Sequence, residues 1–289
     1  MIRRKTFTLR LPSRKLALGE RTLIMGILNV TPDSFSDGGQ FLDGGRAIEH
    51  AFQMERAGAD ILDIGGESTR PGSRCVSAQQ ELDRILPVLN QLRGRLTIPI
   101  SIDTQKAEVA EAAAQAGAEI INDVSALRSD PELAKVARRH RLPIILTHMR
   151  GAPRTMQQGP FARNVLRDVT HGLREALARA KRFGIAKSQI VLDPGIGFGK
   201  NYAQNFELLA RLPELARLGY PLLVGTSRKA FIGHTLGNVA AEERIWGTAA
   251  TVAASIFGCA HIVRVHDVAE MAQVAKIADA IAAASRARA

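Results

Sequence analysis

The sequence predicts a (β/α)₈ barrel, a closed ring of eight parallel strands with a helix after each strand. Two observations support this prediction. Short apolar runs alternate along the chain with longer segments of helical spacing, as is typical of parallel sheets. Each apolar run also leads into polar residues, at the strand ends where barrel enzymes carry their active sites. An open doubly wound sheet usually has a GxGxxG turn after its first strand; this chain lacks one there, so the closed barrel is favoured.

Length and composition fit one such barrel. The chain has 289 residues, of which 46% are hydrophobic, and a barrel of this type typically has about 250 residues. Because no linker or composition shift interrupts it, residues 1–289 are expected to form a single domain. No run is long and apolar enough to span a membrane. Residues 1–19 are basic but lack the apolar core of a signal peptide, so we expect a hairpin across the barrel bottom and a cytoplasmic protein.

The net charge of +11 raises the question of nucleic-acid binding. The basic residues are dispersed, aromatic residues make up only 4% of the chain, and no stretch interleaves the two kinds. A stacking surface for nucleic acid needs that interleaving, so no nucleic-acid partner is expected. A basic balance also suits anionic small molecules. The two cysteines, Cys75 and Cys259, suggest neither a disulfide framework nor a metal site.

The first strand opens the stretch MGILNVTPDSFSDGG, residues 25–39. An apolar run followed by Pro, Asp and Gly indicates a buried strand that enters a polar loop. Asn29 stands at this edge, where its neutral oxygen could ligate Mg²⁺, bond a phosphate, or merely cap the turn. Seven more apolar runs end in the same way, and we expect strands at residues 61–64, 98–102, 120–121, 144–146, 190–192, 222–224 and 261–265.

Helical spacing of apolar residues predicts the segments between the strands. The pattern is plain in residues 77–92, where Leu82, Ile85, Leu86 and Leu89 fall on one stripe. The expected helices are 45–57, 77–92, 105–116, 131–140, 161–183, one that opens at residues 228–229, 242–257 and one that closes the chain through residue 284.

Acid and amide groups end three of these strands: Asp103, Asn122 and Asp193. A carboxylate can accept two parallel hydrogen bonds from an N–H beside an NH₂ group, as on a 2-aminopyrimidinone, by the geometry of the Arg–carboxylate fork. Any one of the three could instead cap the next helix. Three such groups at neighbouring strand ends favour a polar pocket.

Basic groups gather after the last two strands. Lys229 follows the seventh strand, while Arg264 and His266 are alternate residues of the eighth. The loops after these strands are a common phosphate site in barrels, and two cations, an imidazole and backbone N–H groups suit a diphosphate. Alternatively, Arg264 and His266 could be salt-bridged, for instance to Asp267.

Three other segments carry possible functions. Residues 67–72, ESTRPG, offer hydroxyls and a guanidinium and could be a mobile lid or a solvated surface loop. Residues 195–200, GIGFGK, permit close approach, with Phe198 offering a ring face or simply packing in the core. We interpret His148 as a core histidine with satisfied hydrogen bonds.

The chain contains no GxSxG, HExxH, CxxC or Walker motif, so nothing requires a covalent intermediate. What remains is a site that holds a flat polar heterocycle with carboxylates and a diphosphate with cations. Such a site fits a substitution in which pyrophosphate leaves, with catalysis by positioning and charge stabilisation.

Seven blocks of the sequence together resemble the motif set of the dihydropteroate synthase family: MGILNVTPDSFSDGG, LDIGGESTRPGS, ISIDTQKAEV, IINDVSA, LDPGIGFGKN, LLVGTSRKAFIG and HIVRVHDV. The resemblance runs from about Thr22 to Ala269. It implies a (β/α)₈ transferase (EC 2.5.1.15) of folate biosynthesis that joins 6-hydroxymethyl-7,8-dihydropterin diphosphate to p-aminobenzoate and releases pyrophosphate. It further implies Mg²⁺ as cofactor, inhibition by sulfonamides and a homodimer.

The resemblance also implies site residues. The pterin would be bound by Asp103, Asn122, Asp193, Lys229 and Arg264. The diphosphate would be bound by Asn29, Thr69, Arg264 and His266, with Asn29 also binding the metal. The p-aminobenzoate pocket would be formed by Phe35, Arg70, Pro71, Phe198 and Ser227. The groups assigned to catalysis are Lys229, Arg264 and Asp103.

Two positions depart from the family pattern. Thr147 stands where a Met often walls the pterin pocket, and Ala230 stands where a Ser can help to hold the benzoate. Both affect the expected substrate affinity more than the reaction type. The alternatives are a pterin-binding methyltransferase domain, which would not need the cationic residues, and an inactive paralogue that binds pterin without turnover.

Overall fold

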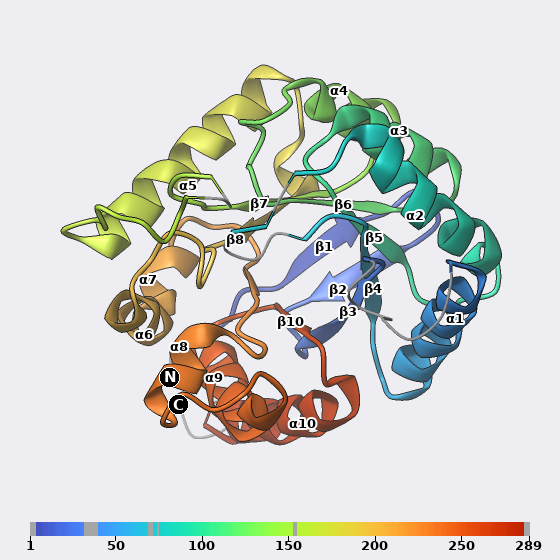
Figure 1. Cartoon of the computed structure of the whole chain (residues 1–289). Coiled ribbons are helices and arrows are strands. Elements are labelled where there is room, and N and C mark those ends of the chain that lie inside the picture. The colour runs from blue at the N-terminus through green and yellow to red at the C-terminus, as the bar shows by residue number, and fades with distance from the viewer. Residues whose placement is uncertain (1–3, 32–39, 69–71, 74, 153–154, 286–289) are drawn as a thin grey trace.

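The computed structural model describes residues 4–31, 40–68, 72–73, 75–152 and 155–285. Eight parallel strands form a ring with helices on its outside (Figure 1). The strands are β3 (Leu23–Asn29), β4 (Ile61–Gly65), β5 (Ile100–Asp103), β6 (Ile120–Asp123), β7 (Ile144–Thr147), β8 (Ile190–Asp193), β9 (Leu223–Val224) and β10 (Ile262–Val265). Their order is β8-β7-β6-β5-β4-β3-β10-β9, and a parallel bridge between Leu192 and Leu222 joins the two ends. The predicted (β/α)₈ barrel is confirmed.

The helices follow the strands in the expected alternation. They are α1 (Gln40–Arg56), α2 (Ala78–Leu92), α3 (Ala107–Gln115), α4 (Glu132–Arg139), α5 (Val165–Arg182), α6 (Tyr202–Ala210), α7 (Leu212–Ala216), α8 (Ala230–Thr235), α9 (Ile245–Phe257) and α10 (Val268–Ala284). The predicted bounds of α2 hold, because Ser77 caps this helix in a capping box with Gln80.

Several helix bounds differ from the prediction. Helix α5 begins at Val165 rather than at residue 161, because Asn164 caps it by accepting the N–H of Arg167. Helix α1 begins five residues before the predicted start and includes Gly44 and Gly45. The predicted helix 242–257 is divided into a 3₁₀ turn and α9. Helices α6 and α7 were not located from the sequence.

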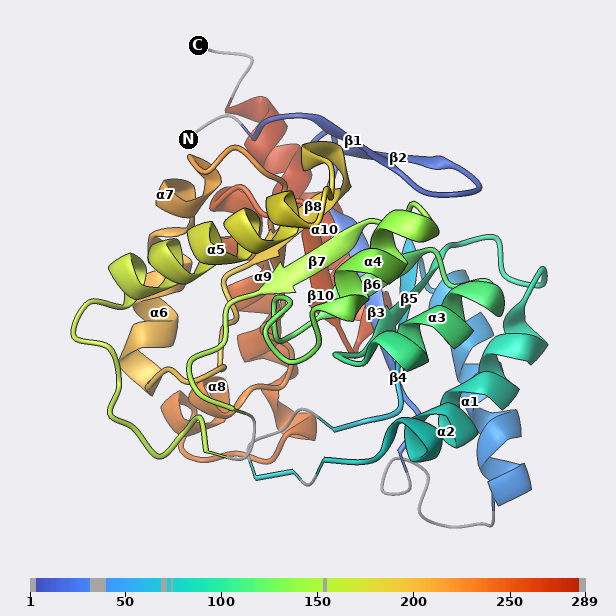
Figure 2. The same ribbon diagram turned by 90° about the horizontal axis from the view of Figure 1, so that it is seen from above.

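An antiparallel hairpin closes one end of the barrel. Strands β1 (Phe7–Arg10) and β2 (Lys15–Leu18) pair with each other, and Figure 2 shows them at the end away from α8. The buried hairpin residues Leu9, Leu11 and Leu18 pack on one apolar cluster that the barrel strands supply: Leu23, Met25, Ile61, Ile120, Ile145, Val191, Leu223 and Ile262. The predicted hairpin across the barrel bottom is confirmed, and it seals that end with apolar side chains.

The alternation of side chains along each strand determines which residues face the barrel interior at the end opposite the hairpin. In β5, Ile100 and Ile102 belong to the core between strands and helices, so Ser101 and Asp103 face the barrel interior. By the same alternation, Asp63 follows Ile61 on the inner side of β4, and Arg264 follows Ile262 on β10. The barrel interior is therefore apolar at the hairpin end and polar at the opposite end. None of the described helices is long and apolar enough to cross a membrane.

Candidate active site

A layer of buried polar side chains fills the C-terminal end of the barrel. Its members come from six different strands and nearly all are less than 10% exposed: Asp63, Ser101, Asp103, Asn122, Thr147, Asp193 and the half-buried Arg264. Polar groups are costly to bury unless they are paired. Their concentration at the strand ends therefore marks a functional site rather than a core.

Arg264 is the centre of this layer. Its Nε donates to Asp63 Oδ2 at 2.6 Å and its Nη2 to Asp103 Oδ2 at 2.7 Å. The amide of Asn122 donates to the same Asp63 oxygen at 3.0 Å. Three strands thus meet at one guanidinium, and a fourth, β6, joins them through the bond from Asn122 to Asp63. The alternative that Arg264 is salt-bridged is confirmed, but its partners are Asp63 and Asp103. Asp267, the partner suggested from the sequence, pairs with Arg228.

Asp63 was missed in the sequence, although it carried a signal. It is the single polar residue of the strand ILDIG and is fully buried. Strand register places Asp63 beside Ser101 and Gly65 beside Asp103. An acidic residue at an inward position of an otherwise apolar strand requires a buried partner, and that partner is Arg264.

One guanidinium shared by two carboxylates leaves an excess negative charge in this cluster. Burial raises the pKa of Asp103 to about 7; the charge of Arg264 opposes this rise, and the charge of Asp63 adds to it. Within the described residues, the Oδ1 atoms of Asp63 and Asp103 and the hydroxyl of Thr147 are buried without a hydrogen-bond partner. Such atoms are rare in folded proteins, and here the Asp103 oxygen and the Thr147 hydroxyl are acceptors suited to a ligand that carries N–H groups.

Asp193 and Lys229 lie on the other side of the same opening. Asp193 accepts the N–H of Gly195 at 2.7 Å, and burial raises its pKa while the charge of Lys229 opposes the shift. The Lys229 ammonium bonds the carbonyl of Ile196 and lies 4.9 Å from the ring centre of Phe198. Burial lowers the pKa of Lys229 to about 8, against the effect of Asp193.

The GIGFGK loop is held by a second buried lysine, Lys200. Its ammonium bonds Nδ1 of His148 at 3.1 Å and the carbonyl of Phe198 at 2.9 Å. Burial and the charge of Lys200 lower the pKa of His148 to about 2, so this histidine is neutral, buried and hydrogen-bonded, as expected. The predicted role for the glycines in close approach also holds, since a Cβ on Gly195 would lie 1.9 Å from the His148 carbonyl. Phe198 is half-buried beneath Lys229 rather than part of the core.

His266 and Ser227, which were predicted to serve different substrates, contact each other. The backbone N–H of His266 donates to Ser227 Oγ at 3.1 Å, and His266 Nδ1 lies 3.0 Å from the same oxygen. With its oxygen already accepting, the hydroxyl can donate to Nδ1, which leaves the imidazole proton on Nε2. Ser227 thereby orients the ring of His266.

The remaining predicted residues fall into two groups. Asn29 ends β3 opposite Gly65 and is half-buried at the rim. Phe35, Thr69, Arg70 and Pro71 lie outside the described residues. Among the described residues, the structure therefore brings together the ion cluster of Asp103, Asn122 and Arg264, and beside it Asp193, Lys229, Phe198, Ser227 and His266.

Comparisons with known proteins show what the sequence and the fold are similar to. The chain matches the family described as pterin binding enzyme over residues 25–266. It is 52% identical over 263 residues to the dihydropteroate synthase of Synechocystis sp., a match that covers 91% of each chain. It superposes on the Yersinia pestis dihydropteroate synthase in a sulfonamide drug complex with a TM-score of 0.90 and 44% identity, covering 96% of this chain and 100% of that one. For the Xanthomonas albilineans dihydropteroate synthase in complex with 7,8-dihydropteroate, the TM-score is 0.86 and the identity 40%, with 96% and 99% of the chains covered.

Replacing Asp103 by Asn tests the excess negative charge of the ion cluster. The pKa of this carboxyl is about 7 in the folded chain and about 4 in the unfolded chain. Because the folded chain holds the proton more tightly, the stability that this carboxyl contributes is lost as the pH rises through this interval. Asn does not titrate. We therefore expect the free energy of unfolding of Asp103→Asn, relative to wild type, to rise with pH by up to about 1.4 kcal/mol per pH unit between about pH 4 and 7.

Urea unfolding at pH 5, 6, 7 and 8 measures this difference. The variant Asp83→Asn, at an exposed position of α2, is the matched control. A difference between Asp103→Asn and wild type that does not change with pH would contradict the charge imbalance.

Proposed function

This chain belongs to the pterin-binding enzyme family, and we propose that its barrel mouth carries out the dihydropteroate synthase reaction. It condenses 6-hydroxymethyl-7,8-dihydropterin diphosphate with p-aminobenzoate to give 7,8-dihydropteroate and pyrophosphate in folate synthesis. The observation that carries this conclusion is the buried polar layer around Arg264, in a chain that aligns over nearly its whole length with dihydropteroate synthases. The relatives and structures compared above are synthases and not methyltransferases.

The polar layer supplies what a pterin requires. A pterin presents a ring N–H beside an exocyclic NH₂ group, and a carboxylate accepts both in parallel. We assign Asp193 to this edge, because one of its oxygens is already fixed by the N–H of Gly195. The unpartnered Oδ1 of Asp103 and the side chain of Asn122 serve the opposite edge of the ring. Arg264 is held on both sides, so its planar guanidinium offers a fixed surface on which the ring stacks.

The cations assist the departure of pyrophosphate. The amine nitrogen of p-aminobenzoate forms a bond to the carbon that carries the diphosphate, the carbon–oxygen bond breaks, and pyrophosphate leaves with the electron pair while the amine loses a proton. Arg264, Lys229 and the Nε2–H of His266 stabilise the charge that develops on the leaving group. Because these groups are oriented before substrate binds, little reorganisation is needed during the reaction.

Magnesium fits this site as an ion held mainly by the diphosphate. Mg²⁺ binds oxygen ligands, usually keeps several waters, and takes few ligands from the protein when a substrate phosphate is present. The half-buried amide of Asn29 at the end of β3 is a suitable neutral oxygen donor, whereas the nearby carboxylates Asp63 and Asp103 are engaged by Arg264. Bound there, the ion supplies positive charge beside the diphosphate.

The second substrate is assigned to the rim of the site. Phe198, which is half-buried, has the Lys229 ammonium over its ring, and Ser227 is buried beside His266. Phe35, Arg70 and Pro71 keep their predicted roles in this pocket, and Thr69 keeps its role at the diphosphate. Thr147 places a buried hydroxyl where an apolar wall is common in the family, which adds an acceptor for the pterin. Ala230 is exposed and offers no hydroxyl for the benzoate.

A pyrophosphate assay tests the proposed reaction directly. We expect release of pyrophosphate from the pterin diphosphate only when p-aminobenzoate is present, in equal amount to dihydropteroate, and we expect EDTA to abolish this release.

In the same assay Arg264→Ala should lower kcat/KM at least about tenfold, because a charge-assisted hydrogen bond contributes roughly 1.5–3 kcal/mol. Absence of turnover, or release that is independent of the amine, would contradict the proposal.

The assembly proposed for the enzyme is a homodimer, and its proposed location is the cytoplasm. A groove of about 370 Å³ between α9 and α10 is lined almost entirely by apolar side chains: Ala253, Phe257, Val274, Ile277, Ala278 and Ile281, with Gln273 at its edge. Ile277 is 66% exposed and Ile281 50%, which is unusual for a contiguous set of large apolar residues. A second copy of the same face would cover both. The chain has only two cysteines, Cys75 and Cys259, which lie far apart in the sequence, and so low a cysteine content suits a reducing compartment.

Charge placed in this groove tests the dimer. We expect Ile277→Glu to convert a dimer into a monomer in sedimentation velocity, because a buried carboxylate without a partner is costly. Gln115→Glu, which adds the same charge at an exposed position of α3, should leave the dimer intact. A wild-type monomer, or an unchanged dimer of the Ile277→Glu variant, would exclude this face as the interface.

A further inference from the structure

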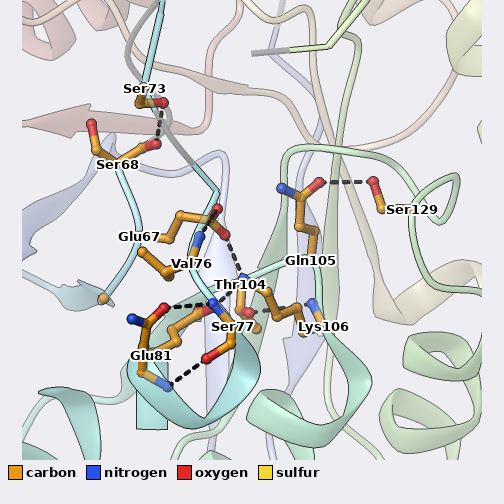
Figure 3. Close-up of polar contacts among 12 residues, drawn as sticks. Glu67, Ser68, Ser73, Val76, Ser77, Glu81, Thr104, Gln105, Lys106 and Ser129 are labelled. Atoms are coloured by element: carbon orange, nitrogen blue, oxygen red, sulfur yellow. Dashed lines mark hydrogen bonds and ion pairs between the residues drawn. The ribbon is translucent and has the colours of Figure 1, made fainter. Parts of the chain in front are cut away.

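A second ion cluster lies beside the active site, at the exit of strand β4. The ammonium of Lys106 lies 2.6 Å from Glu67 Oε2 and 2.6 Å from Glu81 Oε2, between the loop after β4 and helix α2 (Figure 3). Glu81 is fully buried, and its second oxygen has no hydrogen-bond partner among the described residues. Two carboxylates share one lysine, so removal of Lys106 would leave two like charges together.

Glu67 connects this cluster to both ends of the loop after β4. Its other oxygen, Oε1, accepts the N–H of Val76 at 3.2 Å. Inside the loop, the hydroxyl of Ser73 donates to the carbonyl of Ser68 at 2.6 Å, and Figure 3 shows these contacts on one side of the Lys106 ammonium. One carboxylate therefore fixes the start of the loop to its end.

The backbone at Lys106 is itself fixed relative to the active site. Asp103 lies three residues earlier, and the turn between them is held at both ends. The N–H of Thr104 donates to the Asn122 carbonyl at 3.1 Å, and the N–H of Lys106 donates to Thr104 Oγ1 at 3.3 Å. The position of the ammonium is thus tied to the strand ends that carry Asp103 and Asn122.

A close backbone approach brings Glu67 within reach of Lys106. A Cβ on Gly66 would lie 2.9 Å from Ile85 Cγ2 and 3.0 Å from Glu81 Cγ, so only glycine allows the chain to pass α2 at this distance. Arg84 of α2 then holds the Gly66 carbonyl through a 2.6 Å hydrogen bond. The exit of β4 is pinned on the helix side by Arg84 and on the β5 side by Lys106.

We propose that Lys106 is a positioning residue of the reaction, which acts through Glu67 to hold Ser68, Ser73 and Val76 in place at the exit of β4. This inference rests on the proposed function, since Arg70 and Pro71, which follow Ser68 in the sequence, are predicted to bind the second substrate. Lys106 contacts neither substrate in this scheme. The pterin is held deeper, by the polar layer around Arg264, and does not depend on the loop.

The variant Lys106→Met separates these two parts of the site. In the full chain we expect the KM for p-aminobenzoate to rise at least about fivefold, while the Kd for the unphosphorylated pterin alcohol changes less than about twofold. Hydrogen exchange at the Val76 amide should become about tenfold faster, because that N–H is bonded to Glu67. Lys106→Arg, which keeps the charge, should restore most of both properties.

Arg4→Met is the matched control. It breaks a buried ion pair with Asp279 at the opposite end of the barrel, so it should lower Tm while both the KM and Val76 exchange stay at wild-type values. If Lys106→Met behaves like this control, with lower Tm but unchanged KM and unchanged exchange, Lys106 is a structural residue and the proposal is overturned.

A double variant covers the case in which Lys106→Met does not fold. Lys106→Met/Glu81→Leu removes the lysine together with the fully buried carboxylate and still leaves Glu67 without its cation, so the same rise in KM and in Val76 exchange is expected. Wild-type KM and exchange in this double variant would overturn the proposal. A wild-type chain that shows no turnover would refute the proposed function, and Val76 exchange would still decide whether Lys106 holds the loop.

Discussion

The pairing of Arg264 with two buried carboxylates is the interaction on which the site depends. A guanidinium inside the barrel is tolerable only because Asp63 and Asp103 each accept one of its hydrogen bonds. Those bonds fix the plane of the guanidinium and draw the ends of β4, β5 and β10 together. They also use only one oxygen of each carboxylate, so that Oδ1 of Asp103, which has no partner among the described residues, remains as a buried acceptor for the substrate.

The rest of the barrel makes this pairing strong. The hairpin β1–β2 and the inward residues beneath it form an apolar seal below the polar layer, and charges interact more strongly where water is excluded. A net negative cluster in such a place reduces the stability of the empty enzyme, as functional sites commonly do. The excess charge suits a substrate that brings N–H donors. The ammonium of Lys229 and the imidazole of His266 follow the ends of β9 and β10, where the anionic diphosphate is assigned.

Much of the fold and part of the site could be predicted from local patterns. Apolar runs that end in polar residues located the eight strands, and strand ends gave Asp103, Asn122, Asp193 and Arg264. What the sequence could not give was the choice of partners. The pairs of Asp63 with Arg264, Lys106 with Glu81 and Lys200 with His148 are recognisable only once distant strands and helices are placed side by side. The start of α5 could not be predicted from apolar spacing alone, which suggested an earlier residue. The capping Asn164 determines where this helix begins.

The most direct test of this account is calorimetric titration of Asp63→Asn with the unphosphorylated pterin alcohol. Asp63 is fully buried beneath Arg264 and is assigned no substrate contact. The substitution therefore changes how Arg264 and Asn122 are held, without replacing a residue that is assigned to the ligand. Loss of a charge-assisted hydrogen bond of roughly 1.5–3 kcal/mol predicts at least about tenfold weaker binding. A folded Asp63→Asn variant that binds the pterin with wild-type affinity would contradict the claim that this ion cluster organises the site.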